Sequence, residues 1–145
     1  MSQTPYKVFV SHGSADIWVA EQIAKNIESH GGKAFLDERD VPKGGNFKRI
    51  IHQKIEESNE LFVLFTPWSV QRSWVWIEVG AAWVLDRHMV AVLYGLSIDE
   101  FIQESGGRGV FDDTSIVNLN DVAHYFEELT ARISAANCIA KESNF

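Results

Sequence analysis

The chain has 145 residues, of which 46% are hydrophobic and 23% charged, and it carries 20 acidic against 13 basic residues, a net charge of −7. This length suits one domain with one core, and the acidic balance argues against nonspecific nucleic-acid binding, which needs a basic face. The single cysteine, Cys138, excludes an internal disulfide and indicates a reducing compartment. No apolar run approaches the roughly 20 residues of a membrane helix and no signal-peptide pattern is present, so we expect a cytoplasmic protein.

Predicted strands and helices alternate along the chain. Short apolar or β-rich runs predict strands at residues 6–11, 33–37, 61–65, 90–94 and 115–119. Helical spacing of apolar residues predicts helices at 17–27, 47–55, 74–85 and 122–133, with one helical turn near 98–103. Ser14 or Asp16 can cap the first helix, and Gly31-Gly32 ends it.

This alternation predicts an α/β fold, a five-stranded parallel sheet covered by helices on both faces. The flavodoxin-like strand order 2-1-3-4-5 fits five such units. The continuous apolar run at residues 61–65 is typical of a central strand that is buried on both faces. We expect a single domain over residues 1–145, with a core at about 6–135 and a polar tail at 136–145.

Such sheets bind ligands at the carboxyl ends of the strands, near the switch point between strands 1 and 3. The Ser11–Ser14 turn, the loop after Asp37 and the Thr66–Trp74 connection should converge there. Backbone amides of the turn can hold an anion. The nearest basic residues are Arg39, Lys43 and Lys48.

The helix predicted at residues 74–85 contains one charged residue, Glu78. A helix that is apolar all round is normally buried on all sides, and a buried carboxylate needs a partner. Glu78 therefore either meets a polar ligand at an opening or pairs with a basic residue: Arg39, Arg72 or Arg87. The topology favours an opening, because the helix begins beside the crevice. Trp74 lies four residues earlier on the same helix face.

Other residues near the crevice carry weaker signals. A lone histidine such as His12 is more often a hydrogen-bonding turn residue than a ligand. Asp37 can simply end its strand, and Trp68 fits packing as well as it fits a site. The side chains of Trp76, Val79 and Trp83 are expected in the core. The histidines and Cys138 lack metal-ligand spacing, so we predict no metal site.

Four segments, in this order, resemble a Toll/interleukin-1 receptor (TIR) domain: VFVSH at Val8–His12, FLDERDVPKGGNF at Phe35–Phe47, LFVLFTPWS at Leu61–Ser69 and SWVWIE at Ser73–Glu78. The resemblance covers residues 6 to about 94 well. The second segment matches the loop that TIR domains use in self-association and in gating the site. The fourth matches the W-x-x-x-E helix, whose acid is catalytic in TIR domains that cleave NAD+.

The resemblance implies that Glu78 is the catalytic carboxylate and that Trp74 lines the nicotinamide-ribose pocket. Other implied substrate-binding residues are Ser11, His12, Gly13, Asp37, Arg39, Lys43, Phe47 and Trp68. NAD+ is then a substrate, and no cofactor is expected. Many TIR scaffolds lack this glutamate, so its presence favours an NAD+ nucleosidase that resembles stand-alone bacterial TIR proteins in antiviral defence signalling. Implied partners are further copies of the chain and an effector or sensor on another chain, with no nucleic acid and no membrane.

Cleavage of the nicotinamide–ribose bond releases a neutral leaving group, so the site must mainly stabilise oxocarbenium-like charge on the ribose, as an ionised Glu78 would. Attack by water or by an adenine nitrogen then decides between hydrolysis and cyclisation. Two other functions fit the same residues. One is a scaffold that signals by TIR–TIR contacts through residues 38–47, and the other is a nucleoside deoxyribosyltransferase-like enzyme, which also uses a carboxylate on a ribosyl centre.

Overall fold

The structure, a computed structural model, describes residues 4–36, 47–106, 109–112 and 115–142. Its elements are β1 (Lys7–Ser11), the 3-10 turn η1 (Ser14–Asp16), α1 (Ile17–Ser29), β2 (Lys33–Leu36), α3 (Phe47–Glu57), β3 (Glu60–Phe65), α4 (Ser73–Val84), β4 (His88–Leu93), α5 (Ile98–Ser105), β5 (Ile116–Asn118), the 3-10 turn η3 (Leu119–Asp121) and α6 (Val122–Glu142). The strands form one parallel sheet in the order β2-β1-β3-β4-β5. The predicted fold and strand order are confirmed.

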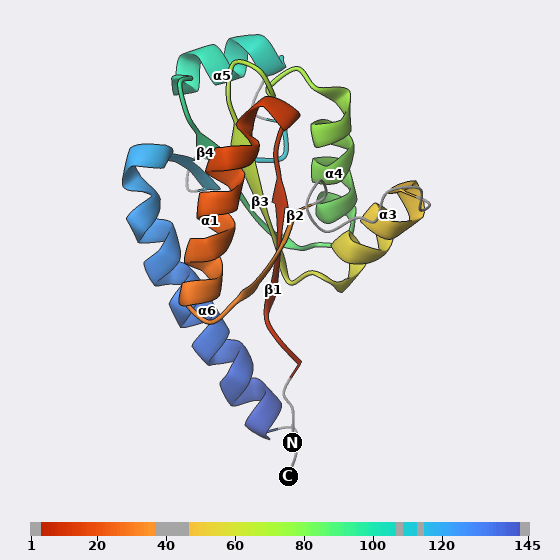
Figure 1. Cartoon of the computed structure of the whole chain (residues 1–145), viewed down its shortest axis with the longest axis vertical. Helices are drawn as coiled ribbons and strands as arrows, with labels where there is room; N and C mark the ends of the chain where they lie inside the picture. The colour runs from red at the N-terminus through yellow and green to blue at the C-terminus, as the bar shows by residue number, and fades with distance from the viewer. Residues whose placement is uncertain (1–3, 37–46, 107–108, 113–114, 143–145) are drawn as a thin grey trace.

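Helices cover both faces of this sheet (Figure 1). Alternate strand residues point to opposite faces, so β1 sends Val8 and Val10 into the core beneath α1 and α6, and Phe9 into the core beneath α3 and α4. Every residue of β3 is buried, as expected for a strand that lies between β1 and β4 and is covered on both sides. None of the described helices has the length and hydropathy needed to cross a bilayer.

The helix α4 is buried along one stripe only. Val75, Glu78, Val79 and Ala82 are buried, and their i, i+3, i+4, i+7 spacing places them on one helix face. On the outer face, the side chains of Ile77, Trp83 and Val84 are 57%, 56% and 73% exposed. The predictions that this helix is buried all round and that Trp83 lies in the core are therefore wrong, because a helix on the outer layer can turn only one face to the sheet.

The second half of the chain is more regular than predicted. The helix α5 has a capping box: Ser97 Oγ accepts a hydrogen bond from the Glu100 backbone N–H at 3.1 Å, and the Glu100 carboxylate accepts one from the Ser97 N–H at 3.2 Å. Gly106, with φ +79°, ends this helix. The final helix, α6, continues to Glu142 through residues that the sequence analysis treats as a polar tail.

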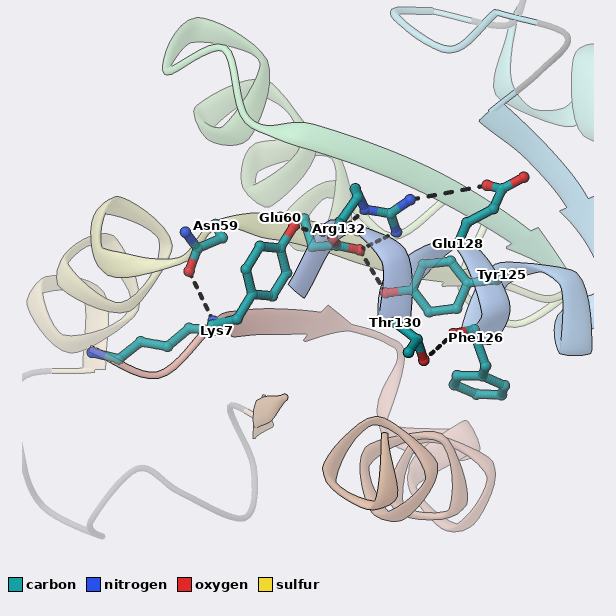
Figure 2. A network of polar contacts seen from close by, with 9 residues as sticks. Lys7, Asn59, Glu60, Tyr125, Phe126, Glu128, Thr130 and Arg132 are labelled. Carbon is teal, nitrogen blue, oxygen red and sulfur yellow. Dashed lines mark hydrogen bonds and ion pairs between the residues drawn. The ribbon is translucent and has the colours of Figure 1, made fainter. Parts of the chain in front are cut away.

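A buried carboxylate ties α6 to the amino ends of the strands (Figure 2). Glu60, the first residue of β3, is 0% exposed. Its oxygens accept hydrogen bonds from Tyr6 at 2.5 Å, from Tyr125 at 2.6 Å and from the Arg132 guanidinium at 2.8 and 3.0 Å. The Glu60 carboxylate is ion-paired with Arg132, and both of its oxygens accept hydrogen bonds. A buried carboxylate is tolerated under these two conditions.

The same network changes the acidity of its members. Burial, followed by the Glu60 charge and hydrogen bond, raises the pKa of Tyr125 well above its usual value. Burial and the Glu60 hydrogen bond likewise raise the pKa of Tyr6. Burial alone would lower the pKa of Arg132, but its hydrogen bonds and ion pair with Glu60 raise it. All three groups therefore hold their protons at neutral pH.

Candidate active site

The carboxyl end of β1 meets α4 through a direct side-chain contact. Ser11 Oγ donates a hydrogen bond to Glu78 Oε1 at 2.7 Å, between residues that lie 67 positions apart. Both side chains are 0% exposed. Ser11 is the last residue of β1, so its hydroxyl reaches α4 at the switch point predicted from the topology.

The expectation that Glu78 lies open to a ligand is not met. Its carboxylate belongs to the stripe of α4 that packs on the sheet, between Val75 and Ala82, and is enclosed there. Of the described cavities, one of about 320 Å³ lies beside Lys33 and one of about 220 Å³ beside His88, and Glu78 lines neither. The side chain is thus held inward in this arrangement.

Three arginines were possible ion-pair partners of Glu78: Arg39, Arg72 and Arg87. Arg39 lies outside the described residues. Arg72, the residue before α4, is exposed, and Arg87 donates through Nη2 to the Glu56 carbonyl oxygen at 2.8 Å. Within the described ranges, neither Arg72 nor Arg87 forms an ion pair with Glu78.

The turn after β1 is packed against the connection after β3. A Cβ atom at Gly13 would approach the Ser69 Cβ to 3.1 Å, a distance that is tight enough to favour glycine there. The His12 ring is 4% exposed, and its Nδ1 lies 3.2 Å from the Val10 carbonyl oxygen. Because a carbonyl only accepts, this bond requires the tautomer with a proton on Nδ1.

Asp16 does not cap α1, contrary to prediction, and Ser14 makes no side-chain cap at η1 either. The Asp16 carboxylate instead accepts a hydrogen bond from Thr66 Oγ1 at 2.6 Å. Ser69 Oγ accepts from the Thr66 N–H at 2.9 Å and donates to the Leu64 carbonyl oxygen at 3.0 Å. These bonds fix the connection after β3 against the β1 turn.

The other predicted site residues lie in different environments. Trp74 is half-buried and packs against the core beneath α4. Trp68 follows Thr66 in the fixed connection, where its indole is 63% exposed. Phe47 begins α3, but its side chain lies outside the described part of the chain, as do Asp37, Arg39 and Lys43. The structure therefore brings together Ser11, Glu78 and the turn that follows β1.

Sequence reasoning missed the Ser69, Thr66 and Asp16 hydrogen bonds, although a Thr-Pro-Trp-Ser sequence directly after an apolar strand is a turn signal that could have indicated Ser69. No group of histidine, cysteine and carboxylate side chains in the described residues has the arrangement of a metal site.

The parallel sheet in the order β2-β1-β3-β4-β5, covered by helices on both faces, defines the chain as a flavodoxin-like α/β domain. The TIR-domain family model matches residues 8–131, so the chain belongs to the TIR domain family. TIR domains commonly self-associate, and the family includes enzymes that cleave NAD+.

Solved structures share this fold. The TIR domain of the Toll-related receptor TRR-2 from Hydra magnipapillata is 21% identical, with a TM-score of 0.64 over 88% of this chain and 96% of that one. A TIR-STING receptor from C. gigas is 23% identical, with a TM-score of 0.66 over 92% of this chain and 41% of the receptor. A 2-desoxiribosyltransferase from Leishmania mexicana is 11% identical, with a TM-score of 0.56 over 77% of each chain. No curated protein sequence is significantly similar to this one.

Proposed function

We propose that this chain cleaves the nicotinamide–ribose bond of NAD+, with Glu78 as the catalytic carboxylate. The observation that carries the proposal is the Ser11–Glu78 hydrogen bond at the carboxyl edge of the sheet, in a chain of the TIR family. A carboxylate whose rotamer is fixed by a buried hydroxyl is pre-organised for charge that develops on a ribose.

The proposed reaction needs few groups. The ribose C1′–nitrogen bond breaks, its electron pair leaves with nicotinamide, and the positively charged nicotinamide becomes neutral. The ionised Glu78 carboxylate stabilises the oxocarbenium-like charge on the ribose until water, or an adenine nitrogen, attacks C1′. Trp74, one turn earlier on α4, supplies an aromatic wall for the nicotinamide-ribose moiety.

The enclosure of Glu78 favours an enzyme that is dormant until it is triggered. With its carboxylate 0% exposed, the substrate ribose reaches it only after the surrounding side chains have moved. Self-association or a ligand that binds the open arrangement more tightly would shift the population toward activity. This fits a role in defence-type signalling that is switched on by assembly or by another chain.

Mass spectrometry of products formed from NAD+ by the concentrated protein tests this function. We expect nicotinamide together with ADP-ribose or a cyclic ADP-ribose. The same protein should not exchange bases between deoxynucleosides, the reaction expected of a deoxyribosyltransferase-like enzyme. Intact NAD+ at every protein concentration, including conditions in which the chain is assembled, would overturn the proposal.

A non-catalytic scaffold is the second candidate function, and the outer face of α4 favours it. Ile77, Trp83 and Val84 expose apolar surface on one helix face, and exposed apolar groups gathered in one place are typical of protein–protein contacts. In this alternative, a second copy of the chain covers that face and signalling follows from assembly alone.

A further inference from the structure

A cavity of about 320 Å³ lies at the amino end of the sheet. Glu78 is at the opposite end of the strands, where it contacts the last residue of β1. Its walls include Lys7, Lys33, Lys54, Phe35 and Ser58. Lys7 and Lys33 are the first residues of β1 and β2 and are direct register partners. Lys54 comes from the last turn of α3, so three separate elements each contribute one lysine to the lining of this cavity.

This gathering of positive charge is unusual in a chain with a net charge of −7. Nearby acids neutralise it only in part. Glu57 Oε2 lies 3.8 Å from both Lys7 Nζ and Lys54 Nζ, so one carboxylate serves two lysines, and Glu28 also lines the cavity. Lys33 forms no ion pair with another residue of the described ranges. A lysine at the C-terminal end of α3 is favoured by the helix dipole, which explains the position of Lys54. The dipole does not explain why lysines begin two neighbouring strands.

The cavity also has an apolar wall. The Phe35 ring packs against the Phe9 ring at 5.1 Å between centroids, and Lys54 Nζ lies 5.6 Å from the Phe35 centroid. Ser58 Oγ donates to the Lys54 carbonyl oxygen at 2.6 Å, which orders the end of α3. An apolar wall excludes water from one side of the ammonium groups and strengthens their attraction for an anion.

The position of Lys7 is fixed independently of any ligand. Its backbone N–H donates to Asn59 Oδ1 at 2.8 Å, and its side chain extends away from the Glu60 network (Figure 2). The strand start, and with it the root of the lysine side chain, is therefore held in place before an anion arrives, which lowers the entropy lost on binding.

We infer that this cavity binds a small soluble anion that carries more than one phosphate charge, of the pyrophosphate type. Lysine binds phosphate as a point charge, without the fixed fork of the arginine guanidinium. A compact ligand with several negative charges matches three lysines better than a ligand with one carboxylate does. The volume lies at the lower end of the roughly 300–1,000 Å³ typical of ligand pockets. This inference does not depend on NAD+ cleavage.

Titration of the isotope-labelled full chain with inorganic pyrophosphate, followed by amide NMR shifts, tests the inference. We expect saturable shifts at Lys7, Lys33 and Ser58, and Lys33→Gln should weaken binding by about tenfold. The control is Lys25→Gln, because Lys25 is an exposed lysine of α1 that does not line the cavity. This control should bind pyrophosphate as the unaltered chain does.

Three outcomes would overturn the inference: no saturable shifts, equal weakening by Lys33→Gln and Lys25→Gln, or shifts centred on Gly13. The last would place the anion at the β1 turn. The Glu78→Gln variant keeps the two proposals separate, since it should bind pyrophosphate normally even if it never cleaves NAD+. An unchanged melting temperature of Lys33→Gln shows that any weakening is not due to unfolding.

Discussion

At the residue scale, Ser11 and Glu78 depend on each other. The Ser11 hydroxyl, which the sequence predicts at the substrate site, donates to the Glu78 carboxylate at 2.7 Å. Ser11 is therefore a positioning residue in the proposed reaction. The strand and helix patterns predict that both residues lie at the same end of the sheet, but the bond between them depends on side-chain directions in two elements that meet only after folding.

Removal of the Ser11 hydroxyl should damage both stability and the proposed activity. Ser11→Ala leaves one oxygen of a fully buried carboxylate without its donor, which should lower the free energy of unfolding by about 1–3 kcal/mol. It should also lower kcat for nicotinamide release more than it raises KM, because the carboxylate loses its fixed orientation. Urea unfolding and steady-state kinetics measure the two effects.

The control for this variant is Ser134→Ala, which removes an exposed hydroxyl of α6 and should change neither quantity. If Ser11→Ala unfolds like the unaltered chain and releases nicotinamide at the same rate, the hydrogen bond does not position Glu78.

At the element scale, α6 is attached to the sheet through Glu60. A sequence run of Leu61–Phe65 predicted the buried strand, but nothing in it indicated that the acid just before the strand would be buried and shared by Tyr6, Tyr125 and Arg132. Those residues are distant in sequence, and an arginine is usually exposed. The sequence predicted only one helical turn near residues 98–103, whereas the Ser97–Glu100 capping box belongs to a full helix, α5.

Tyr125→Phe should lower the free energy of unfolding by about 1–3 kcal/mol at pH 8, because Glu60 loses a buried donor. The pH dependence follows from the raised pKa of Tyr125. A folded-state pKa above the unfolded value of 10.0 gives stability that is complete below pH 10 and is lost as pH rises beyond it. Urea unfolding between pH 8 and 10.5 should therefore show an alkaline fall that is shallower in Tyr125→Phe than in the unaltered chain. An equally steep fall in both would contradict this account of the network.

At the scale of the whole molecule, the sheet order and the two helical layers followed from the alternation of strand and helix patterns alone. Hydrophobicity could not predict which side of α4 faces outward, because nearly every residue of that helix is apolar. Neighbouring elements decide this, and they leave Ile77, Trp83 and Val84 on the surface. The enclosure of Glu78 follows from the same packing, since its stripe of α4 is the one turned to the sheet.

If copies of the chain assemble through the outer face of α4, Trp83→Glu should reduce assembly. Introducing a charge into an apolar contact opposes association, whereas an exposed substitution should change folding stability by no more than about 0.5 kcal/mol. Sedimentation velocity over a concentration series measures the assembled fraction. Trp18→Glu is the matched control, because Trp18 is also exposed but belongs to α1 on the other face of the sheet. Equal assembly of the two variants would exclude this face of α4.

The role of Glu78 is tested most directly by the rate of nicotinamide release from NAD+ by assembled protein, compared between Glu78→Gln and Glu56→Gln. The amide keeps the shape of the side chain and removes its charge, and Glu56 is an exposed glutamate of α3. We expect Glu78→Gln to lower the rate by about 100-fold or more, the scale of losing a principal electrostatic group, and Glu56→Gln to leave it unchanged. Release by Glu78→Gln at the rate of the unaltered chain would show that the enclosed carboxylate has no part in catalysis.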